Sequence, residues 1–581
     1  MSNLVLEAKN KIDEILNAAC AKAAEKGELP AGAVLKGTVE IPKDTANGDF
    51  AANHAMTGAK QLHMAPVKIA AALVANIDLE GTWFSSVETA GPGFINFRLA
   101  PLWYSDVLNA IRAEGEDYGR NNTGNGEKVV VEFVSANPTG PMHIGNARGG
   151  VLGDALAAVL ERDGYTVSRE FYVNDAGNQI EKFAQSLDAR YRQLILGEDA
   201  VEFPEDGYHG DDIKALAEAF RAENGDEWIN KPEDKRKAAM AQFGLSRNIP
   251  KMKADLERYG INYDVWFLES TLHETGFVED TVNALAQKGY TYEKDGALWL
   301  RTSEIIGEKL RNAGKTEKDI EKLELKDDVL RRANGFYTYF AADIAYHRNK
   351  LEVRGFDRAV NVWGADHHGH IARLKAAMDA LGLDGENRLD IVLMQLVNLL
   401  SDGKPVKISK RTGKSISLSN LLDDIPVDAA RYFFNAKPES AIDFDLDLAI
   451  RQDSENPVYY VQYAHARICT MLSNLASEGF EVPKAGEADL ALLTDATELE
   501  LIKQLALLPE EIRMAARDYD PSRINKYVME LAARFHRFYT VCRIRDAEPA
   551  VRDARLFLAD DVRRVIENSL DIIGVSSPEK M

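Results

Sequence analysis

The chain has 581 residues, of which 45% are hydrophobic and 28% are charged, a balance typical of a globular protein. Because a single hydrophobic core rarely grows beyond about 300 residues, we expect about three or four domains. The formal net charge of −22 argues against nucleic acid as a general partner. A local basic patch can still bind it, because binding depends on local charge rather than on the total.

Signals for export or membrane insertion are missing from the sequence. The cysteines, Cys20, Cys469 and Cys542, lack the spacing of metal ligands, so we predict no disulfide framework and no zinc site. The first residues lack the apolar stretch of a signal peptide, and no apolar run is long enough to span a bilayer. We therefore expect a cytoplasmic protein without a membrane partner.

Residues 1–120 are predicted to form a separate α+β domain. Apolar residues recur at helical spacing in residues 4–26, and a second helix is expected at 67–77. Residues 91–99 join a Gly-Pro-Gly turn to a strand in which Phe and Ile alternate with Asn and Arg. Residues 121–126, rich in Asn and Gly, are the expected linker to the next domain.

A strand, a turn and a helix follow one another at the start of that domain. Residues 130–134 suit a buried parallel strand, which the prolines and the glycine of 137–141 end. The helix expected at 144–163 contains residues that are poor helix formers, Gly145, Gly149, Gly150 and Gly153. We explain the first by the close approach of a ligand and the others by a packed strand. A glycine-bearing turn before a helix suits a phosphate group, to which His143 can donate a hydrogen bond.

Further strands are expected at 167–173, 264–270 and 359–364. Their alternation with helices predicts a parallel sheet with right-handed crossovers. Ligands of such sheets bind at the carboxyl ends of the strands. Residues 198–255 interrupt the alternation, are acidic and helix-prone, and are expected to form an insertion that is peripheral to the site.

Tyr339 and Asp343 are four residues apart, so they share one face of a helix. A phenol and a carboxylate on one face can bind a planar cationic group together, although a structural cap or salt bridge is the default explanation of such a pair. Glu269 is a weaker third candidate for the same ligand. The His-rich run 366–370 has a metal-binding composition, but neighbouring helical positions diverge, so we predict no metal site there.

Residues 406–414 form a basic, glycine-bearing loop with four cations within eight residues. Taken alone, such a loop can be a solvated segment or a nucleic-acid patch. The sharper hypothesis is a mobile loop that delivers lysines to a leaving pyrophosphate.

The C-terminal third, from Pro426 onward, is expected to be entirely helical. Residues 496–575 predict three or four amphipathic helices, and aromatic and basic residues interleave at 534–539. The default interpretation is a bundle whose aromatic residues form the core. The alternative is that they stack on splayed single-stranded bases.

Two stretches resemble the signatures of class I aminoacyl-tRNA synthetases. Residues 143–146, His-Ile-Gly-Asn, resemble the His-x-Gly-His signature, and the longer run 135–148 resembles its arginyl form. Asn146 replaces the second His of the signature, so it keeps a donor without a positive charge. Residues 407–411, Lys-Ile-Ser-Lys-Arg, resemble the Lys-Met-Ser-Lys-Ser signature. The two stretches stand in the expected order, more than two hundred residues apart.

Both ends of the chain resemble the same family. Residues 91–97 resemble part of the N-terminal extension of arginyl-tRNA synthetases. Residues 428–431, Asp-Ala-Ala-Arg, resemble the Asp-Ala-Leu-Arg pattern of their anticodon-binding bundle, with Ala for Leu. The implied fold is α/β and multidomain, with a Rossmann-like parallel-sheet catalytic domain, an α+β N-terminal domain and an all-α C-terminal bundle. The expected domains are 1–120 (N-terminal, contacting tRNA), 127–400 (catalytic, with the insertion near 198–255), 401–455 (basic loop and connecting region) and 456–581 (anticodon-binding).

The resemblance implies ATP-dependent attachment of L-arginine to its cognate tRNA through an arginyl-adenylate. It also implies Mg²⁺ with the phosphates, no zinc, contacts to the acceptor end, outer corner and anticodon of the tRNA, and arginine activation that needs bound tRNA. We expect a monomer. The implied catalytic residues are His143, Asn146, Lys407 and Lys410. The implied ATP-binding residues are Thr139, Gly140, His143, Gly145, Asn146, His367, Lys407, Ser409 and Lys410. The implied arginine-binding residues are Glu132, Ser135, Asn137, Glu269, Tyr339, Asp343 and Asp366.

Two other classes of protein stay open. A nucleotidyltransferase shares the His-x-Gly-His sheet but has no anticodon domain, which fits a chain of 581 residues poorly. A catalytically weak synthetase paralogue would only bind tRNA. The intact His143, Lys407 and Lys410 argue against that paralogue, and a pyrophosphate-exchange assay would decide.

Overall fold

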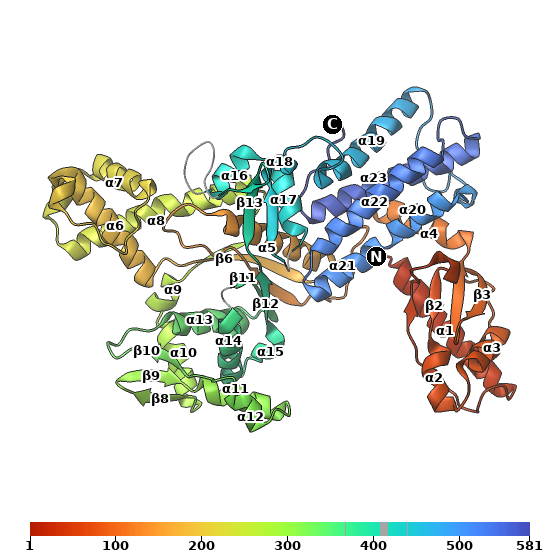
Figure 1. Cartoon of the computed structure of the whole chain (residues 1–581), viewed down its shortest axis with the longest axis horizontal. Helices are drawn as coiled ribbons and strands as arrows, with labels where there is room; N and C mark the ends of the chain where they lie inside the picture. Colours follow the sequence, from red (N-terminus) through yellow and green to blue (C-terminus); the bar gives the residue numbers. More distant parts are fainter. Residues whose placement is uncertain (366–367, 407–415, 438–439) are drawn as a thin grey trace.

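The computed structural model describes residues 1–365, 368–406, 416–437 and 440–581. Figure 1 shows an N-terminal domain beside a set of long C-terminal helices, and a central sheet with further helices around it. This arrangement confirms the predicted fold class: an α+β N-terminal domain, a parallel-sheet domain and a helical C-terminal bundle.

The N-terminal domain is a four-stranded antiparallel sheet packed against helices. The sheet order is β1 (Val39–Glu40), β2 (Phe50–Ala52), β4 (Phe94–Leu99) and β3 (Phe84–Ala90). The helices are α1 (Leu4–Glu25), α2 (His54–Leu62) and α3 (Pro66–Asn76). Helix α1 starts where the side chain of Asn3 accepts a hydrogen bond from the Leu6 N–H, and it buries Ala8, Ile12 and Leu16 at helical spacing.

Helix α4 (Pro101–Glu114) leaves this domain and packs against α20 and α23 of the C-terminal bundle. Its Arg112 pairs with Asp560 and Asp561 of α23 at 2.5 and 2.7 Å. The segment predicted as the end of the N-terminal domain is thus anchored on the far end of the chain.

The central sheet is parallel and has five strands. Their order is β12 (Leu389–Met394), β11 (Arg358–Gly364), β5 (Lys128–Glu132), β6 (Thr166–Val173) and β7 (Val265–Leu268). Helix α5 (Ile144–Arg162) connects β5 to β6. A Cβ atom on Gly153 would lie 2.1 Å from Phe133 Cγ, so only glycine lets α5 pack this closely on the chain that leaves β5. The close approach predicted for Gly153 is confirmed, although its partner Phe133 lies just after the strand and not in it.

A helical body projects from the sheet on the side away from the C-terminal helices (Figure 1). It consists of α6 (Gly177–Leu196), α7 (Asp211–Asn224) and α8 (Glu233–Arg258), which share their own apolar core. The amide of Asn248 in α8 donates to the carbonyl of Pro138 at 2.8 Å. Helix α8 thus contacts the turn that precedes α5, and the expectation that the insertion is peripheral to the site stays a prediction.

A second apolar core lies on the other part of the sheet and includes Val130 and Ala359 of its strands. Helices α9 (Ser270–Glu274), α10 (Phe277–Gln287), α11 (Thr302–Asn312), α13 (Tyr339–Arg348) and α14 (His368–Leu381) contribute to it, and the short helices α12 (Glu317–Glu321) and α15 (Gly385–Arg388) belong to the same stretch of the chain. A π-helical turn, Asn349–Val353, continues α13. A small antiparallel sheet in this region has the order β10 (Asp328–Arg331), β9 (Ala297–Leu300) and β8 (Thr291–Lys294).

A three-stranded sheet connects this core to the C-terminal helices. Its order is β14 (Lys404–Pro405), β13 (Val397–Ser401) and β15 (Ile442–Asp445), with helices α16 (Leu418–Asp424), α17 (Val427–Asn435) and α18 (Leu446–Ala449) beside it in sequence. The prediction of an entirely helical chain from Pro426 is wrong at β15. This short strand pairs in parallel with β13, more than 40 residues earlier. Its four residues are too few to show the alternation of apolar and polar residues that would predict a strand from the sequence.

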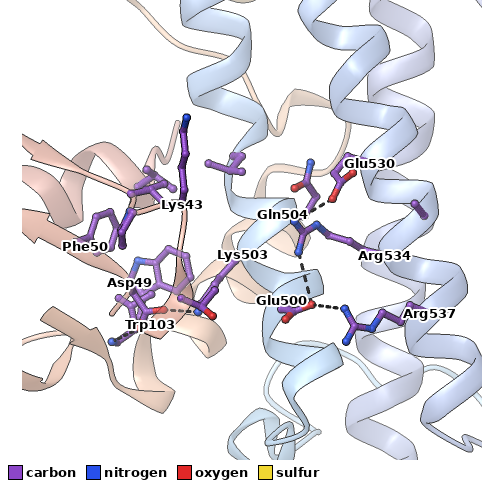
Figure 2. A pocket seen from close by; sticks show the side chains of 17 residues that line it. Lys43, Asp49, Phe50, Trp103, Glu500, Lys503, Gln504, Glu530, Arg534 and Arg537 are labelled. Carbon is purple, nitrogen blue, oxygen red and sulfur yellow. Dashed lines mark hydrogen bonds and ion pairs between the residues drawn. The ribbon is translucent and has the colours of Figure 1, made fainter. Parts of the chain in front are cut away.

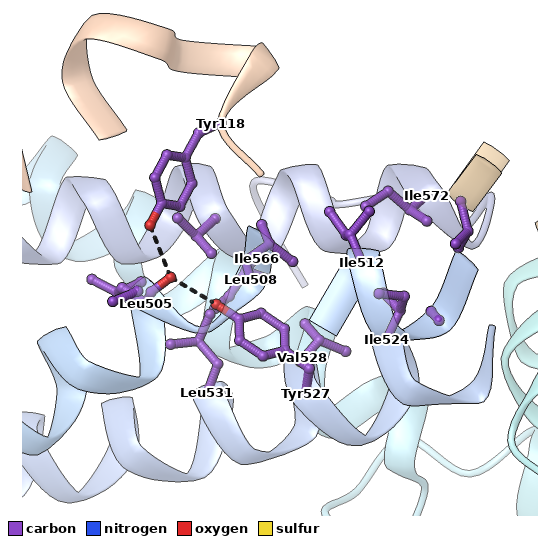
Figure 3. Close-up of a cluster of buried hydrophobic side chains, with 14 of the residues drawn as sticks. Tyr118, Leu505, Leu508, Ile512, Ile524, Tyr527, Val528, Leu531, Ile566 and Ile572 are labelled. Atoms are coloured by element: carbon purple, nitrogen blue, oxygen red, sulfur yellow. Dashed lines mark hydrogen bonds between the residues drawn. The ribbon is translucent and has the colours of Figure 1, made fainter. Parts of the chain in front are cut away.

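The C-terminal bundle comprises α19 (Pro457–Ser477), α20 (Ala496–Ala506), α21 (Leu508–Asp518), α22 (Ser522–Val541) and α23 (Pro549–Ile572). Figure 3 shows its core, where the hydroxyls of Tyr118 and Tyr527 both donate to the carbonyl of Leu505, at 3.1 and 3.3 Å. Because Tyr118 follows α4, this core also holds the chain that leads into the central sheet. Among the described residues, no helix combines the length and the apolar character that crossing a membrane would need.

The N-terminal sheet also meets the bundle across a cavity of about 470 Å³. Figure 2 shows Lys503 of α20 paired with Asp49 of the N-terminal domain, and Glu500 paired with Arg534 and Arg537 of α22. The two basic residues of α22 that the sequence placed among aromatic neighbours thus lie at this interdomain face.

Arg431 joins three parts of the chain. Its buried guanidinium donates to the carbonyls of Tyr259 and Ile573, at 3.2 and 3.1 Å, and pairs with Asp154 of α5 at 2.5 Å. Asp428, three residues earlier, accepts from the Ser576 N–H at 3.0 Å. The Asp-Ala-Ala-Arg run therefore connects the C-terminal end of the chain to α5 through hydrogen bonds and an ion pair.

We expect Arg431→Met to destabilise the protein, because it leaves Asp154 with Arg169 alone and removes the donor from the carbonyls of Tyr259, Gly260 and Ile573. Breaking a buried ion pair costs about 3–5 kcal/mol, so the thermal unfolding midpoint should fall clearly in a calorimetric scan. Arg451→Met is the matched control, because Arg451 is exposed and its pairs with Asp453 and Glu455 lie in solvent. Equal midpoints for the two variants would contradict this role of Arg431.

Candidate active site

A cavity of about 550 Å³ opens at the carboxyl ends of β5, β6 and β11, where ligands of parallel sheets bind. It brings together six of the predicted site residues: Glu132, Ser135, Asn137, Asn146, Tyr339 and Asp343. Other residues that line it were not predicted: Tyr172, Trp363, His370 and Arg373. Tyr172 and Trp363 stand near the carboxyl ends of their strands, a position that would have identified them.

His143 and Asn146 together cap the N-terminus of α5. The ring Nδ1 of His143 accepts from the Gly145 N–H at 3.2 Å, and the Asn146 Oδ1 accepts from the His143 N–H at 3.0 Å. This reciprocal pair is a capping box. Because Nδ1 acts as the acceptor, the ring proton of His143 lies on Nε2. Burial lowers the pKa of His143, so the ring is a neutral donor at neutral pH.

The chain between β5 and α5 has an unusual backbone. Val134 and Ser135 have φ of +68° and +41°, a region that a β-branched residue such as Val rarely adopts. The Ser135 hydroxyl donates to Glu132 at 2.9 Å and accepts from the Tyr172 N–H at 3.1 Å, which holds this turn against β6. Strain of this kind is found at ligand sites, where the surroundings fix the backbone.

Two carboxylates lie near Tyr172, and one of them, Asp343 on α13, lines the cavity. Burial, and then the charges of Asp343 and of Glu269, which is buried just after β7, raise the pKa of Tyr172. Asp343 accepts a hydrogen bond from His370 at 2.6 Å. Burial opposes its ionisation, but the hydrogen bond from His370 and the nearby charge of Lys350 favour it, and the pKa of Asp343 is lowered. The cavity beside Asp343 therefore suits a cation.

Tyr339 is the first residue of α13 and lies one turn before Asp343. Its hydroxyl accepts from the Asn178 N–H at 3.0 Å, at the start of α6. The residue is 45% exposed and lines the cavity.

Glu132 has a buried cationic partner. Lys350, in the π-helical turn, is fully buried and donates to Glu132 at 2.5 Å and to Asn361 at 3.2 Å. The same ammonium lies 3.9 Å from Glu170, which also forms an ion pair with Arg354. Because its charge is already neutralised, Glu132 supports the floor of the cavity and keeps little charge for a ligand.

The remaining predicted residues lie elsewhere. Thr139 is buried, and a Cβ on Gly140 would stand 3.2 Å from Asp212 of α7, so this turn faces the helical body. Gly145 lies against the ring of His143. The predictions for Asp366, His367, Lys407, Ser409 and Lys410 lie outside the described residues.

Family models match the chain in three consecutive parts. The model for the tRNA synthetases class I (R) catalytic domain matches residues 107–446, more than half of the chain. The model for the arginyl tRNA synthetase N terminal domain matches 10–99, and the model for the DALR anticodon binding domain matches 461–581. The chain belongs to the arginyl-tRNA synthetase family.

Full-length relatives agree with this membership. A protein of Acetivibrio thermocellus named arginine--tRNA ligase is 50% identical, and one of Ruminiclostridium cellulolyticum is 51% identical, each with 100% of both chains covered. The arginyl-tRNA synthetase structure of Thermus thermophilus has a TM-score of 0.73 at 21% identity and covers 98% of this chain and 100% of its own. That structure shows the same fold. The cavity lies within the residues that match the catalytic domain, and the bundle from residue 461 onward lies within those that match the anticodon-binding domain.

We expect His143→Ala to lower the rate of adenylate formation roughly 10²–10³-fold, the scale for loss of one preorganised donor. His143→Asn keeps a donor and should lose much less. Because the pKa of His143 is lowered, the wild-type rate should stay flat down to about pH 6.5, the ordinary histidine value. It should fall only below that pH, where protonation of Nδ1 removes the acceptor for Gly145. Rates of ATP–pyrophosphate exchange between pH 5 and 8 test this, and near-normal turnover of His143→Ala would refute it.

Proposed function

We propose that the chain attaches L-arginine to its cognate tRNA at the expense of ATP. An arginine carboxylate oxygen attacks the α-phosphorus of ATP, the bond to the β-phosphate bridging oxygen breaks, and pyrophosphate leaves. A hydroxyl of the terminal ribose of tRNA then attacks the carbonyl carbon, loses its proton, and AMP leaves. The observation that carries the proposal is a cavity lined by Tyr339 and Asp343 and by Asn146, which caps the N-terminus of α5 together with His143.

The protein's part in this reaction is to position reactants and stabilise charge. The Nε2–H of His143, at the positive N-terminal end of α5, is suited to phosphate oxygens. Asn146 keeps its amide nitrogen available, since only its oxygen serves the cap. Asn137 and Asp366 are our candidates for the α-ammonium group of arginine, and Lys407 and Lys410 for the charge on the departing pyrophosphate.

Mg²⁺ would enter with ATP and neutralise phosphate charge. In the described ranges, no three His, Cys, Asp or Glu side chains gather as an ion-binding group. This fits an ion that phosphates hold, because Mg²⁺ is usually bound through substrate phosphates and few carboxylates.

An aromatic surface on the bundle suits the anticodon. Tyr459 and Tyr463 stack with an interplanar angle of 8°, and the ring of His536 lies 6.2 Å beyond Tyr463. The guanidinium of Arg467 lies 4.4 Å from the ring of Tyr539. Tyr463 is 40% exposed, which leaves room for a splayed base to stack. By contrast, Phe535 and Phe538 are fully buried and belong to the core.

We propose further that the N-terminal domain contacts the outer corner of the tRNA, and that the enzyme acts as a cytoplasmic monomer. The ion pair between Asp49 and Lys503 supports the first point, because it holds that domain beside the bundle. The comparisons give no support to a paralogue that only binds tRNA.

The function is tested by aminoacylation assays with arginine or with lysine as the amino acid, and with a control reaction that omits tRNA. The planar guanidinium of arginine can donate two parallel hydrogen bonds to a carboxylate, and the ammonium of lysine cannot, so lysine should be a poor substrate.

Asp343→Asn should raise the arginine KM by one to a few powers of ten, since a hydrogen bond to a charged group contributes about 1.5–3 kcal/mol. The ATP KM should hardly change. If Asp343→Asn leaves arginine binding intact while Glu269→Gln abolishes it, the guanidinium is held by Glu269 alone.

Tyr463→Ala should raise the KM for tRNA roughly tenfold, because stacking contributes about 1–3 kcal/mol per base. Tyr463→Phe is the matched control and should behave like the wild type. The dependence of tRNA affinity on salt should have the same slope in both variants, since phosphate contacts set that slope. Unchanged tRNA affinity in Tyr463→Ala would remove this surface from the anticodon site.

A further inference from the structure

His370 lies between an arginine and the carboxylate of Asp343. Its Nε2 is 2.6 Å from Asp343 Oδ2, and its Nδ1 is 3.3 Å from a guanidinium nitrogen of Arg373. Arg373 in turn donates to Asp328 of β10 at 2.6 Å. The four side chains form one line of hydrogen bonds that runs from the small antiparallel sheet to the cavity.

The direction of these hydrogen bonds follows from the chemistry of the groups. A guanidinium has only donors, so Nδ1 of His370 must be the acceptor and the ring proton lies on Nε2. Nε2–H therefore donates to Asp343, and the ring is neutral in this arrangement. The carboxylate keeps its full negative charge while one of its oxygens is fixed.

The second histidine near Asp343 has the opposite tautomer. His347 Nδ1 lies 2.8 Å from the backbone carbonyl of Asp343, and its Nε2 accepts from the Asn361 amide at 2.6 Å. Its proton is thus on Nδ1, and burial lowers its pKa. One histidine holds the backbone of residue 343 and the other holds its side chain, so both the position and the rotation of the carboxylate are determined.

Packing holds the His370 ring in this orientation. The ring lies edge-on to Phe340 at 5.3 Å and tilted on Trp363 at 5.8 Å. Phe340 comes from the same helix as Asp343, and Trp363 from the end of β11. A ring fixed from two sides can orient its partner, whereas a free side chain would lose this effect to rotamer entropy.

We propose that His370, itself fixed by Arg373 and Asp328, is a positioning residue for arginine selection. It holds Oδ2 of Asp343 so that Oδ1 and the negative charge point to the guanidinium of arginine. A planar cation binds a carboxylate well only when the carboxylate plane is set in advance, so the relay acts on affinity and selectivity rather than on the chemical step. The proposal rests on Asp343 being the guanidinium carboxylate of the proposed function.

The test compares two substitutions of His370 in ATP–pyrophosphate exchange with tRNA present. His370→Phe keeps a planar ring against Phe340 and Trp363 but removes both hydrogen bonds. It should raise the arginine KM roughly 10- to 100-fold, the scale of one hydrogen bond to a charged group, with kcat and the ATP KM little changed. His370→Gln carries both a donor and an acceptor and should restore most of the affinity. Equal losses in the two variants, or an unchanged KM in His370→Phe, would overturn the proposal.

A double-mutant cycle separates this proposal from the assignment of Asp343. If His370 acts through Asp343, His370→Phe should add little to the arginine KM of Asp343→Asn. Additive effects would mean that His370 contacts arginine by itself and would overturn the proposal. If Asp343→Asn alone leaves the KM unchanged, the assignment of the guanidinium carboxylate fails, whatever His370 does.

Two more measurements locate the effect. Butylguanidine carries only the guanidinium end of arginine, so its inhibition constant should rise in His370→Phe by about the same factor as the arginine KM. An unchanged inhibition constant would move His370 to the α-amino end and refute the proposal. Arg373→Leu, at a partly exposed position, should raise the arginine KM in the same direction but less, because it removes only the group that fixes the tautomer. No rise in Arg373→Leu would remove Arg373 and Asp328 from the proposed relay.

Discussion

The buried ammonium of Lys350 joins the elements from which the active-site cavity is built. It pairs with Glu132 at the end of β5, lies near Glu170 of β6 and donates to Asn361 of β11. A fully buried lysine is tolerated only with such partners, because unpaired burial of a charge costs several kcal/mol. The π-helical turn that carries Lys350 directly follows α13. The charge therefore fixes α13, with Asp343 on it, over the carboxyl ends of three parallel strands.

The cavity lies where two apolar cores meet. One core extends through α5 to the C-terminal bundle, and the other holds α10, α13 and α14. The cap of α5, which we propose holds phosphate oxygens, belongs to the first core, and α13, which carries the carboxylate of Asp343, belongs to the second. Such an arrangement suits a substrate with a cationic end that must meet a phosphate.

The parts proposed to contact tRNA are joined to one another and to the catalytic sheet. Arg112 ties α4 to α23, Tyr118 enters the core of the bundle, and Arg431 ties the end of the chain to α5. Each contact joins residues more than 250 positions apart in sequence or from different domains. The bundle and α5 are therefore connected through packed side chains and ion pairs.

The sequence by itself determined the local elements and the chemistry of the first motif. The run before His143 predicts a strand, a turn and a helix because β-branched residues, prolines and a cap each act within a few positions. The spacing of Tyr339 and Asp343 likewise determines a shared helical face. Only the tertiary structure decided which groups neutralise one another. Lys350 meets Glu132 across 218 positions, His370 meets Asp343 across 27, and β15 is a strand only because β13 lies beside it. Such pairings depend on how the chain packs in space, and no periodicity or propensity along the sequence carries that information.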